Sequence, residues 1–242
     1  METFSLTLID VGWGDSILLE FDNGSYSSFG LIDSNDTQRF SSSFIFLKKY
    51  FERKMYPYKN HKPIFEFVLL SHAHTDHGQG LEPIMREFGT KQFWYPKSIQ
   101  WSGLSTLIRF ANRSSNVIHH QSIDKSKILC NLGSVKLEIL WPEYDKIDHN
   151  NENNNSIILL CTYNNTKFLL TGDAEAETWE KIADLLPNDI NFIKVPHHGS
   201  VNGTFTNNNK TPWLDKVTTN TILGISSHIR PFEHPHQKVI TQ

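Results

Sequence analysis

The sequence predicts an α+β protein in which helices cover β-sheets in layers. Three observations predict this class: the chain begins with consecutive short strands, continues with strands alternating with helices, and carries His and Asp clusters after several strands. The 242 residues, 38% hydrophobic and 20% charged, have the length and composition of one globular domain. We therefore expect a single domain over residues 1–242, with the possibility that it forms part of a larger protein.

The first part of the chain predicts an antiparallel meander. Residues 4–8 alternate between apolar and polar side chains, as in a strand with one buried face. Two more strands are expected at 17–21 and 29–32. The glycines of DVGWGDS allow a tight turn between the first two strands.

Helical periodicity then alternates with short apolar runs. Apolar residues spaced i, i+4, i+7 and i+11 from Phe40 predict an amphipathic helix that ends near Arg53. The apolar run at 64–70 is typical of a strand buried on both faces. The same patterns predict strands at 92–95, 135–141, 157–161, 167–170, 192–195 and 221–225, and helices at 81–88, 104–111 and 179–186. The Asn-dense segment 148–155 is expected to be a polar loop.

The bulk properties exclude several classes of protein. Cys130 and Cys161 lie next to apolar residues, which favours buried free thiols over a disulfide framework. The N-terminus has no signal-peptide pattern and no segment approaches roughly twenty apolar residues. We therefore expect no membrane segment in this chain and a cytoplasmic location. A net charge of −3 gives no overall attraction to nucleic acid, and we interpret the basic residues at 48–62 as a solvated helix face and loop.

The chemistry is concentrated at the ends of buried strands. HAHTDH follows the strand at 64–70, and imidazole and carboxylate are the usual donors for zinc and similar metals. In an extended backbone His72 and His74 point the same way, which suits one ion, while a second ion suits Asp76 and His77. Asp173, at the end of a distant strand, would bridge the two ions, although an Asp in this place also suits a helix N-cap.

Two more histidine segments occupy comparable places. His197 and His198 end a buried strand before Gly199, and we interpret them as part of a site rather than as polar residues of a simple turn. His234 follows the final predicted strand in the same way. Rigid strands that end in polar side chains are how α/β-type enzymes build their sites.

SHAHTDHG, LLTGDAE, KVPHHGS and EHPH, preceded by DVGWGDSILLEF and LIDS, resemble the metallo-β-lactamase superfamily. Within it, the chain looks most similar to the ComEC-like branch, typified by the hydrolase domain of competence proteins. The resemblance runs from Asp10 to His236 and implies a four-layer αββα sandwich with the site at one edge of its sheets. It implies that the metal ligands are His72, His74, Asp76, His77, Asp173 and His198. His198 matches the family ligand better than His197, which becomes a substrate-facing or supporting residue, and His234 becomes a candidate for contacting the scissile group.

The chain departs from the family pattern in three places. Ser34 and Glu233 stand where relatives more often have Gly. Many members also carry a third His for the first metal, whereas this chain offers His149 or an Asn among residues 151–155.

The resemblance implies a metal-dependent hydrolase with two divalent ions, zinc with manganese as the alternative. A water held by these ions has its pKa lowered from about 15.7 to about 7. Asp76 is expected to orient this nucleophile, and His197 or His234 to protonate the leaving group or to hydrogen-bond the developing oxyanion. The expected substrate is a phosphodiester, in nucleic acid or in a small phosphorylated compound, ahead of a β-lactam or thioester. The alternatives are a non-catalytic metal-binding or regulatory module and an iron-dependent oxidoreductase. Nothing in the sequence indicates the oligomeric state or the partner proteins.

Overall fold

A computed structural model describes residues 1–37, 39–55, 57–98, 101–228 and 232–241. The chain divides into two compact units, each with its own β-sheet. Unit 1 comprises Met1–Ile123 and Leu132–Ser134, and unit 2 comprises Asp124–Asn131 and Val135–Gln242.

Unit 1 contains a six-stranded sheet in the order β1-β2-β3-β4-β5-β6. The strands are β1 (Thr3–Leu8), β2 (Ile17–Asp22), β3 (Ser27–Ile32), β4 (Phe65–Leu69), β5 (Thr90–Tyr95) and β6 (Val117–Ser122). β1, β2 and β3 pair antiparallel, which confirms the predicted meander, and β3 to β6 pair in parallel. Because the carboxyl ends of parallel strands meet at one edge, the segments after β3 and β4 start side by side.

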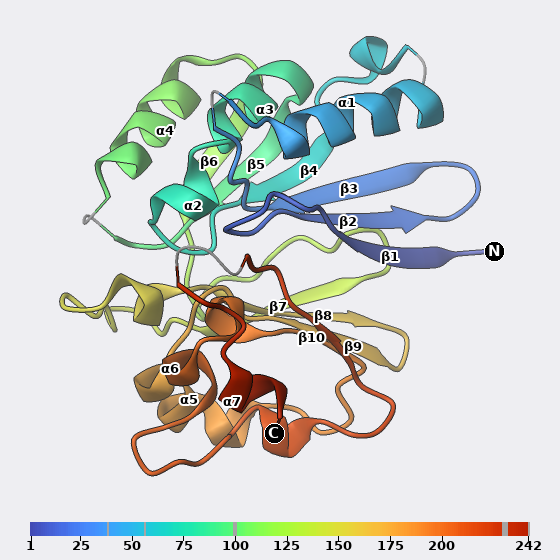
Figure 1. Cartoon of the computed structure of the whole chain (residues 1–242). Helices are drawn as coiled ribbons and strands as arrows, with labels where there is room; N and C mark the ends of the chain where they lie inside the picture. The colour runs from blue at the N-terminus through green and yellow to red at the C-terminus, as the bar shows by residue number, and fades with distance from the viewer. Residues whose placement is uncertain (38, 56, 99–100, 229–231, 242) are drawn as a thin grey trace. The chain divides into compact units, whose positions relative to one another are not determined.

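Helices of unit 1 cover one face of this sheet, as Figure 1 shows for α1, α3 and α4. The helices are α1 (Ser42–Lys54), α2 (Thr75–Gly78), α3 (Leu81–Phe88) and α4 (Ser102–Arg113), with a 3-10 turn η1 (Tyr58–His61) after α1. Phe51 of α1 is fully buried, and its ring lies edge-on to Phe29 of β3 with centroids 5.0 Å apart. Such aromatic pairs add to the burial that fixes a helix on a sheet. The predicted helix is thus confirmed, although Phe40 lies before its first turn and is exposed.

β6 was not predicted from the sequence. It reads VIHHQS, and only Val117 of its six residues is buried. Because the other five residues are at least partly exposed, the period-2 pattern that reveals the other strands is missing.

Unit 2 contains a five-stranded sheet in the order β11-β10-β9-β8-β7. The strands are β7 (Lys136–Trp141), β8 (Ile158–Tyr163), β9 (Thr166–Leu170), β10 (Phe192–Lys194) and β11 (Ile222–Gly224). β7, β8 and β9 are antiparallel, and β9, β10 and β11 are parallel. The predicted hairpin at 157–170 is therefore confirmed, and residues 171–173 and 195–198 leave the sheet from neighbouring strands.

Short helices accompany the sheet of unit 2, and Figure 1 shows α5, α6 and α7 on one side of it. They are α5 (Ala176–Ile182), α6 (Val201–Thr204) and α7 (Gln237–Ile240), with the 3-10 turns η2 (Glu152–Asn155), η3 (Ala183–Leu185), η4 (Pro196–Gly199) and η5 (Leu214–Lys216). Trp141, Trp179 and Trp213 are each at most 3% exposed and lie in the core of this unit. None of the helices in the described ranges is long and apolar enough to cross a membrane.

Two sequence predictions are wrong in detail. Cys161 is buried in β8, as expected, but Cys130 is exposed. Leu129, the apolar residue next to Cys130, is buried, so an apolar neighbour in the sequence did not imply burial of the thiol. The segment 148–155, predicted as a polar loop, forms a 3-10 turn over Glu152–Asn155, whose four polar residues are buried.

Candidate metal centre

Three imidazole rings gather directly after β4. His72 and His77 are fully buried, and their ring centroids lie 4.1 Å apart. His74 Nδ1 lies 3.1 Å from His72 Nε2. The predicted pairing of His72 with His74 therefore has the required proximity.

The extended backbone expected from the sequence ends at His74. Asp76 and His77 belong to the helical turn α2, and this turn brings the His77 ring closer to His72 than the His74 ring is, since the two centroid distances are 4.1 and 4.7 Å. Asp76 Oδ2 lies 3.9 Å from His77 Nε2. The division of these residues between two ions stays a prediction.

Asp33, directly after β3, fixes the orientation of this cluster. Its Oδ1 accepts the Ser71 backbone N–H at 2.7 Å, and its Oδ2 accepts the Ser71 hydroxyl at 2.6 Å. The same Oδ2 lies 2.8 Å from His77 Nδ1. Because a carboxylate accepts hydrogen bonds, Nδ1 carries the proton and Nε2 has the lone pair. Burial raises the pKa of Asp33, and the neighbouring His77 opposes this shift.

A second carboxylate accompanies this arrangement. Asp15 Oδ2 lies 3.9 Å from His77 Nδ1, and Asp15 is 1% exposed. Asp15, Asp33 and His77 form a group whose ligand-type atoms all lie within 4.8 Å of one another. The sequence analysis did not single out Asp15, although it lies in the DVGWGDS segment that matches the family.

Glycines make room for these contacts in ways the sequence did not reveal. A Cβ on Gly14 would lie 2.2 Å from the carbonyl oxygen of Asp76, so the DVGWGDS loop packs directly against α2. A Cβ on Gly78 would overlap the indole of Trp101 at 2.3 Å, so α2 packs closely against the start of α4. Ser34, the departure from the family Gly, is accommodated by Gly80, where a Cβ would lie 2.2 Å from Ser34 Oγ.

Asp173 follows β9 in unit 2 and is buried. Its Oδ2 lies 3.1 Å from His198 Nε2, and its Oδ1 lies 3.4 Å from the Nζ of Lys194, a fully buried lysine. Its backbone N–H donates to Ser156 Oγ at 3.0 Å. Asp173 does not cap the following helix, since Glu175 is the N-cap residue of α5.

The PHHG turn has a strained backbone. His197, His198 and Gly199 have φ angles of 43°, 54° and 79°, in the left-handed region that costs energy for residues other than Gly. His198 is fully buried and its Nδ1 donates to the Ser226 carbonyl at 2.7 Å. His197 is partly exposed, and its Nδ1 lies 2.9 Å from Glu175 Oε1. The two histidines therefore have different partners, and only His198 faces Asp173.

Asparagines of the 148–155 segment hold Glu175. The side-chain amides of Asn151 and Asn153 donate to its two oxygens at 2.8 and 2.7 Å. Although burial alone would raise it, hydrogen bonds from His197, Asn153 and Asn151 lower the pKa of Glu175.

One oxygen of this segment differs from its neighbours. The Oδ1 atoms of Asn151, Asn154 and Asn155 accept hydrogen bonds, from Asn153 N–H, Thr178 Oγ1 and Asp148 N–H respectively. Asn153 Oδ1 is buried and has no hydrogen-bond partner among the described residues. His149 is exposed. Among the alternatives for a further ligand, Asn153 thus has the donor atom that the fold leaves available.

His234 lies near the same residues of unit 2. Its ring is 5.9 Å from that of His197, nearly perpendicular to it. Burial lowers the pKa of His234, and the nearby His197 and His198 act in the same direction. The preceding Glu233 has φ 56°, so this departure from the family Gly occupies a backbone conformation that favours Gly.

The donor set fits divalent metal ions in both units. The Nδ1 atoms of three buried histidines face oxygen partners: Ser71 Oγ at 3.1 Å for His72, Asp33 for His77 and the Ser226 carbonyl for His198. Ligating histidines in proteins show this pattern, with one ring nitrogen oriented by an oxygen and the other available to the metal. In this tautomer His198 Nε2 and the Asp173 carboxylate are two acceptors 3.1 Å apart, an arrangement that a shared cation or proton stabilises.

Comparison with known proteins agrees with this chemistry. The profile of the "Metallo-beta-lactamase superfamily" matches residues 65–208. The chain is 26% identical to ComE operon protein 3 of Bacillus subtilis (strain 168), over 96% of this chain and 30% of that protein. It is 25% identical to the uncharacterized protein YcaI of Escherichia coli (strain K12), over 72% of this chain and 20% of that protein. The chain therefore spans less than a third of the length of these relatives.

A solved metallo-beta-lactamase from Staphylococcus aureus subsp. aureus COL shares the fold with a TM-score of 0.53, at 16% identity, over 88% of this chain and 61% of that one. Two mixed sheets flanked by helices, as in this structure, confirm the predicted α+β class and fold type. Since the family profile covers more than half of its residues, the chain belongs to the metallo-β-lactamase superfamily.

Proposed function

We propose that this chain is a metal-dependent hydrolase that uses a metal-activated water to cleave a phosphodiester, in nucleic acid or in a small phosphorylated compound. The observation that carries the metal-dependent reaction is the arrangement of His72, His77 and His198, each buried with Nδ1 facing an orienting oxygen. Such pre-orientation fixes the tautomer that a metal needs.

We assign the metal ligands as in the sequence analysis. They are His72, His74, Asp76, His77, Asp173 and His198. Asn153 Oδ1 is added as an oxygen donor in preference to His149. We expect two ions, zinc with manganese as the alternative, because imidazole and carboxylate together suit both. The single domain over residues 1–242 also stays a proposal, supported by a profile match that begins in β4 and ends beyond α6.

The bound metal would supply a hydroxide at neutral pH and neutralise charge that develops on the scissile group. Asp76 would orient the nucleophile. Glu175 holds Nδ1 of His197, so the atom of His197 that exchanges a proton with the leaving group is Nε2. His234 has a lowered pKa and would be neutral at pH 7, where it serves as a hydrogen-bonding group rather than as an acid.

The phosphodiester assignment rests on the resemblance to the ComEC-like branch and on the relationship to ComE operon protein 3. A β-lactam or thioester is the alternative substrate.

The proposal is tested by measuring metal content by mass spectrometry and cleavage of bis-p-nitrophenyl phosphate with zinc or manganese. We expect about two metals per chain, as is typical of a two-metal site. Asp173→Ala should lose metal and activity, whereas His119→Ala, an exposed histidine of β6, should keep both. His198→Ala should lose more metal than His197→Ala, and the reverse order would contradict our ligand assignment.

Three other results would redirect the proposal. Absence of metal and of cleavage after reconstitution would indicate a non-catalytic module. Stoichiometric iron in protein purified without added metal would indicate an oxidoreductase. Cleavage of a β-lactam or thioester, with no activity on the phosphodiester, would change the substrate class.

A further inference from the structure

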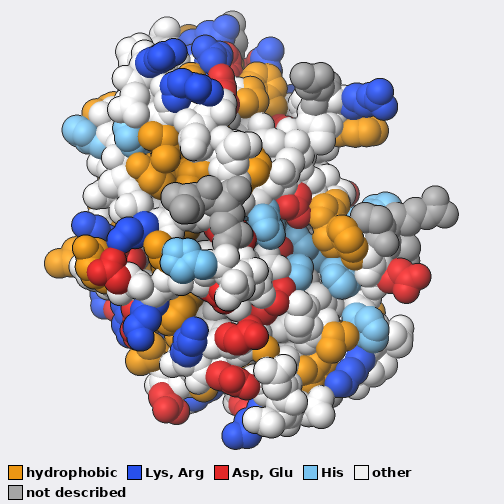
Figure 2. Space-filling model, turned by 90° about the vertical axis from the view of Figure 1, so that its left-hand side faces the viewer, with side chains coloured by type: hydrophobic (Ala, Val, Ile, Leu, Met, Phe, Trp, Pro, Cys, Tyr) orange, Lys and Arg blue, Asp and Glu red, His pale blue; other side chains and the backbone are white. Residues whose placement is uncertain are grey.

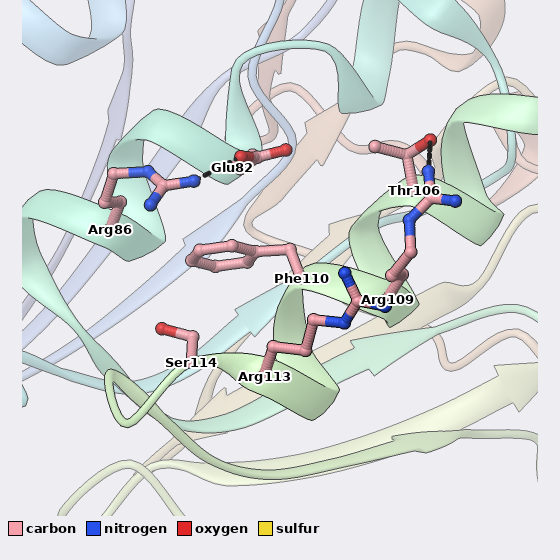
Figure 3. A pocket seen from close by; sticks show the side chains of 7 residues that line it. All are labelled: Glu82, Arg86, Thr106, Arg109, Phe110, Arg113 and Ser114. Carbon is pink, nitrogen blue, oxygen red and sulfur yellow. Dashed lines mark hydrogen bonds and ion pairs between the residues drawn. The ribbon is translucent and has the colours of Figure 1, made fainter.

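A groove of about 380 Å³ lies between α3 and α4 on unit 1. Three arginines line it, Arg86 from α3 and Arg109 and Arg113 from α4, together with the ring of Phe110. Figure 3 shows these side chains around the groove, with Glu82 facing Arg86. Figure 2 views the molecule from the side on which α4 lies in Figure 1. Lys and Arg side chains gather at the top of this view.

The groove is distinct from the histidine cluster. Trp101, at the start of α4, packs against Gly78 next to His77. The helix rises about 1.5 Å per residue, so Arg113 lies roughly 18 Å further along α4. Arg109 and Arg113 are four residues apart and therefore share one face of the helix.

The arginines are only partly neutralised by their surroundings. Arg86 pairs with Glu82 at 2.6 Å and its guanidinium lies over the Phe110 ring at 4.8 Å. Arg109 donates to the uncharged Thr106 hydroxyl at 3.2 Å. Arg113 has no ion pair or hydrogen bond with any residue that the structure describes. Three positive charges and one negative charge leave the lining with a formal charge of +2.

We propose that this groove binds a phosphate monoester. A monoester carries about −1.5 to −2 charges at pH 7, which matches the lining, whereas a carboxylate or a phosphodiester carries only one. Guanidinium groups bind phosphate through paired N–H donors, and arginines from two helices approach a tetrahedral anion from different directions. The Phe110 ring offers an apolar contact for the organic part of such a ligand. Binding here does not require the proposed hydrolysis, although cleavage of a phosphodiester releases a ligand of this class.

Two of the arginines also have a structural role. Arg86 and Arg113 lie in the last turns of α3 and α4, where a positive charge interacts favourably with the helix dipole. This role accounts for neither Arg109, a turn earlier, nor the presence of all three arginines in the lining of one groove. If the arginines only stabilise the helices, their substitution leaves the binding of a phosphate monoester unchanged. If they form a binding site, their substitution weakens it.

The test is calorimetric titration of the full chain with adenosine 5′-monophosphate, inorganic phosphate and adenosine. Arg109→Gln/Arg113→Gln should weaken binding of the monophosphate at least tenfold. Lys48→Gln/Lys49→Gln removes the same charge from exposed positions of α1 and should leave it unchanged. Gln has nearly the helix propensity of Arg and Lys, so both variants keep their helices. Phosphate binding at the metal centre is common to all three proteins and cancels in the comparison.

Glu82→Gln provides a test in the opposite direction. It raises the charge of the lining and should tighten binding of the monophosphate, a gain that misfolding does not produce. If inorganic phosphate binds as tightly as the monophosphate, the ligand of the groove is free phosphate. If the monophosphate binds more tightly, the ligand is a phosphate monoester of nucleotide size. Equal binding of adenosine, or no difference between the arginine variant and wild type, would refute the proposal.

Discussion

The Asp33→Asn variant tests whether Asp33 orients a metal ligand, apart from its contribution to the stability of the fold. In the wild type both carboxylate oxygens accept hydrogen bonds, from the Ser71 backbone, the Ser71 hydroxyl and His77 Nδ1. The amide keeps one acceptor and replaces the other with an NH₂ donor. When that donor faces His77, the imidazole must accept at Nδ1 and carry its proton on Nε2, the atom we assign to the metal.

The loss is expected to appear in metal affinity. Removal of an orienting partner of a ligating histidine typically costs 10–100-fold in metal affinity, or about 1.4–2.7 kcal/mol. The unfolding free energy of metal-free protein should change by less, because the substitution also removes a buried negative charge. Zinc affinity is measured by competition with a chromophoric chelator, and stability by urea denaturation with EDTA present.

Asp36→Asn is the matched control for this experiment. Asp36 is also buried in unit 1, but its carboxylate accepts the backbone N–H groups of Ser43 and Phe44 at the start of α1. This variant should alter stability and leave zinc affinity unchanged. If Asp33→Asn binds zinc like the wild type, or if both variants lose affinity equally, Asp33 does not orient a ligand.

Three further predictions concern parts of the chain outside the proposed centre. A thiol reagent should label Cys130 in the native protein and reach Cys161 only after unfolding, because Cys161 is buried and its pKa is raised by burial; two labels under native conditions would contradict this. Lys54→Met should lower the unfolding free energy by about 2 kcal/mol, because Lys54 pairs with the buried Glu20; a change below 0.5 kcal/mol would show that Tyr50 alone satisfies Glu20. Burial and the hydrogen bond to Glu20 raise the pKa of Tyr50 to about 12, so its contribution to stability persists below pH 10 and is lost as the pH rises through 12; an ultraviolet absorbance titration should lose this late ionisation in Tyr50→Phe.

Strands and helices with buried faces were predictable because burial imposes a period on the sequence. β4 is buried on both sides and appears as an apolar run, while α3 buries Leu81, Ile84, Met85 and Phe88 at helical spacing. Elements without a buried face carry no such signal. β6 exposes most of its side chains, and η2 buries polar residues that a hydropathy pattern assigns to solvent. The burial of the asparagines in and next to η2 depends on hydrogen-bond partners such as Glu175 and Glu177, which lie more than twenty residues away in sequence.

The candidate site was predictable in its ligand types but not in its supporting contacts. Metal-ligand chemistry restricts the donors to few residue types, so HAHTDH stands out from the sequence alone. The residues that orient these donors use ordinary groups that are common everywhere in proteins. Ser71 lies next to His72 in the sequence, but only the folded chain shows its contact with His77 and places the Ser226 carbonyl beside His198.

The backbone of the PHHG turn connects these supporting contacts with the candidate ligand His198. Two consecutive non-glycine residues with positive φ each cost of order 1–3 kcal/mol and persist only when their surroundings hold them. Here His197 N–H donates to the Gly172 carbonyl at 3.3 Å, Ser200 N–H donates to the His197 carbonyl at 2.9 Å, and His236 N–H donates to the Gly199 carbonyl at 2.9 Å. The Gly172 contact holds the PHHG turn beside the TGD segment that carries Asp173, and the Gly199 contact ties the turn to the EHPH segment that carries His234. The hydrogen bonds of the strained turn thus join TGD, PHHG and EHPH, the segments of unit 2 that carry Asp173, His198 and His234, into one framework.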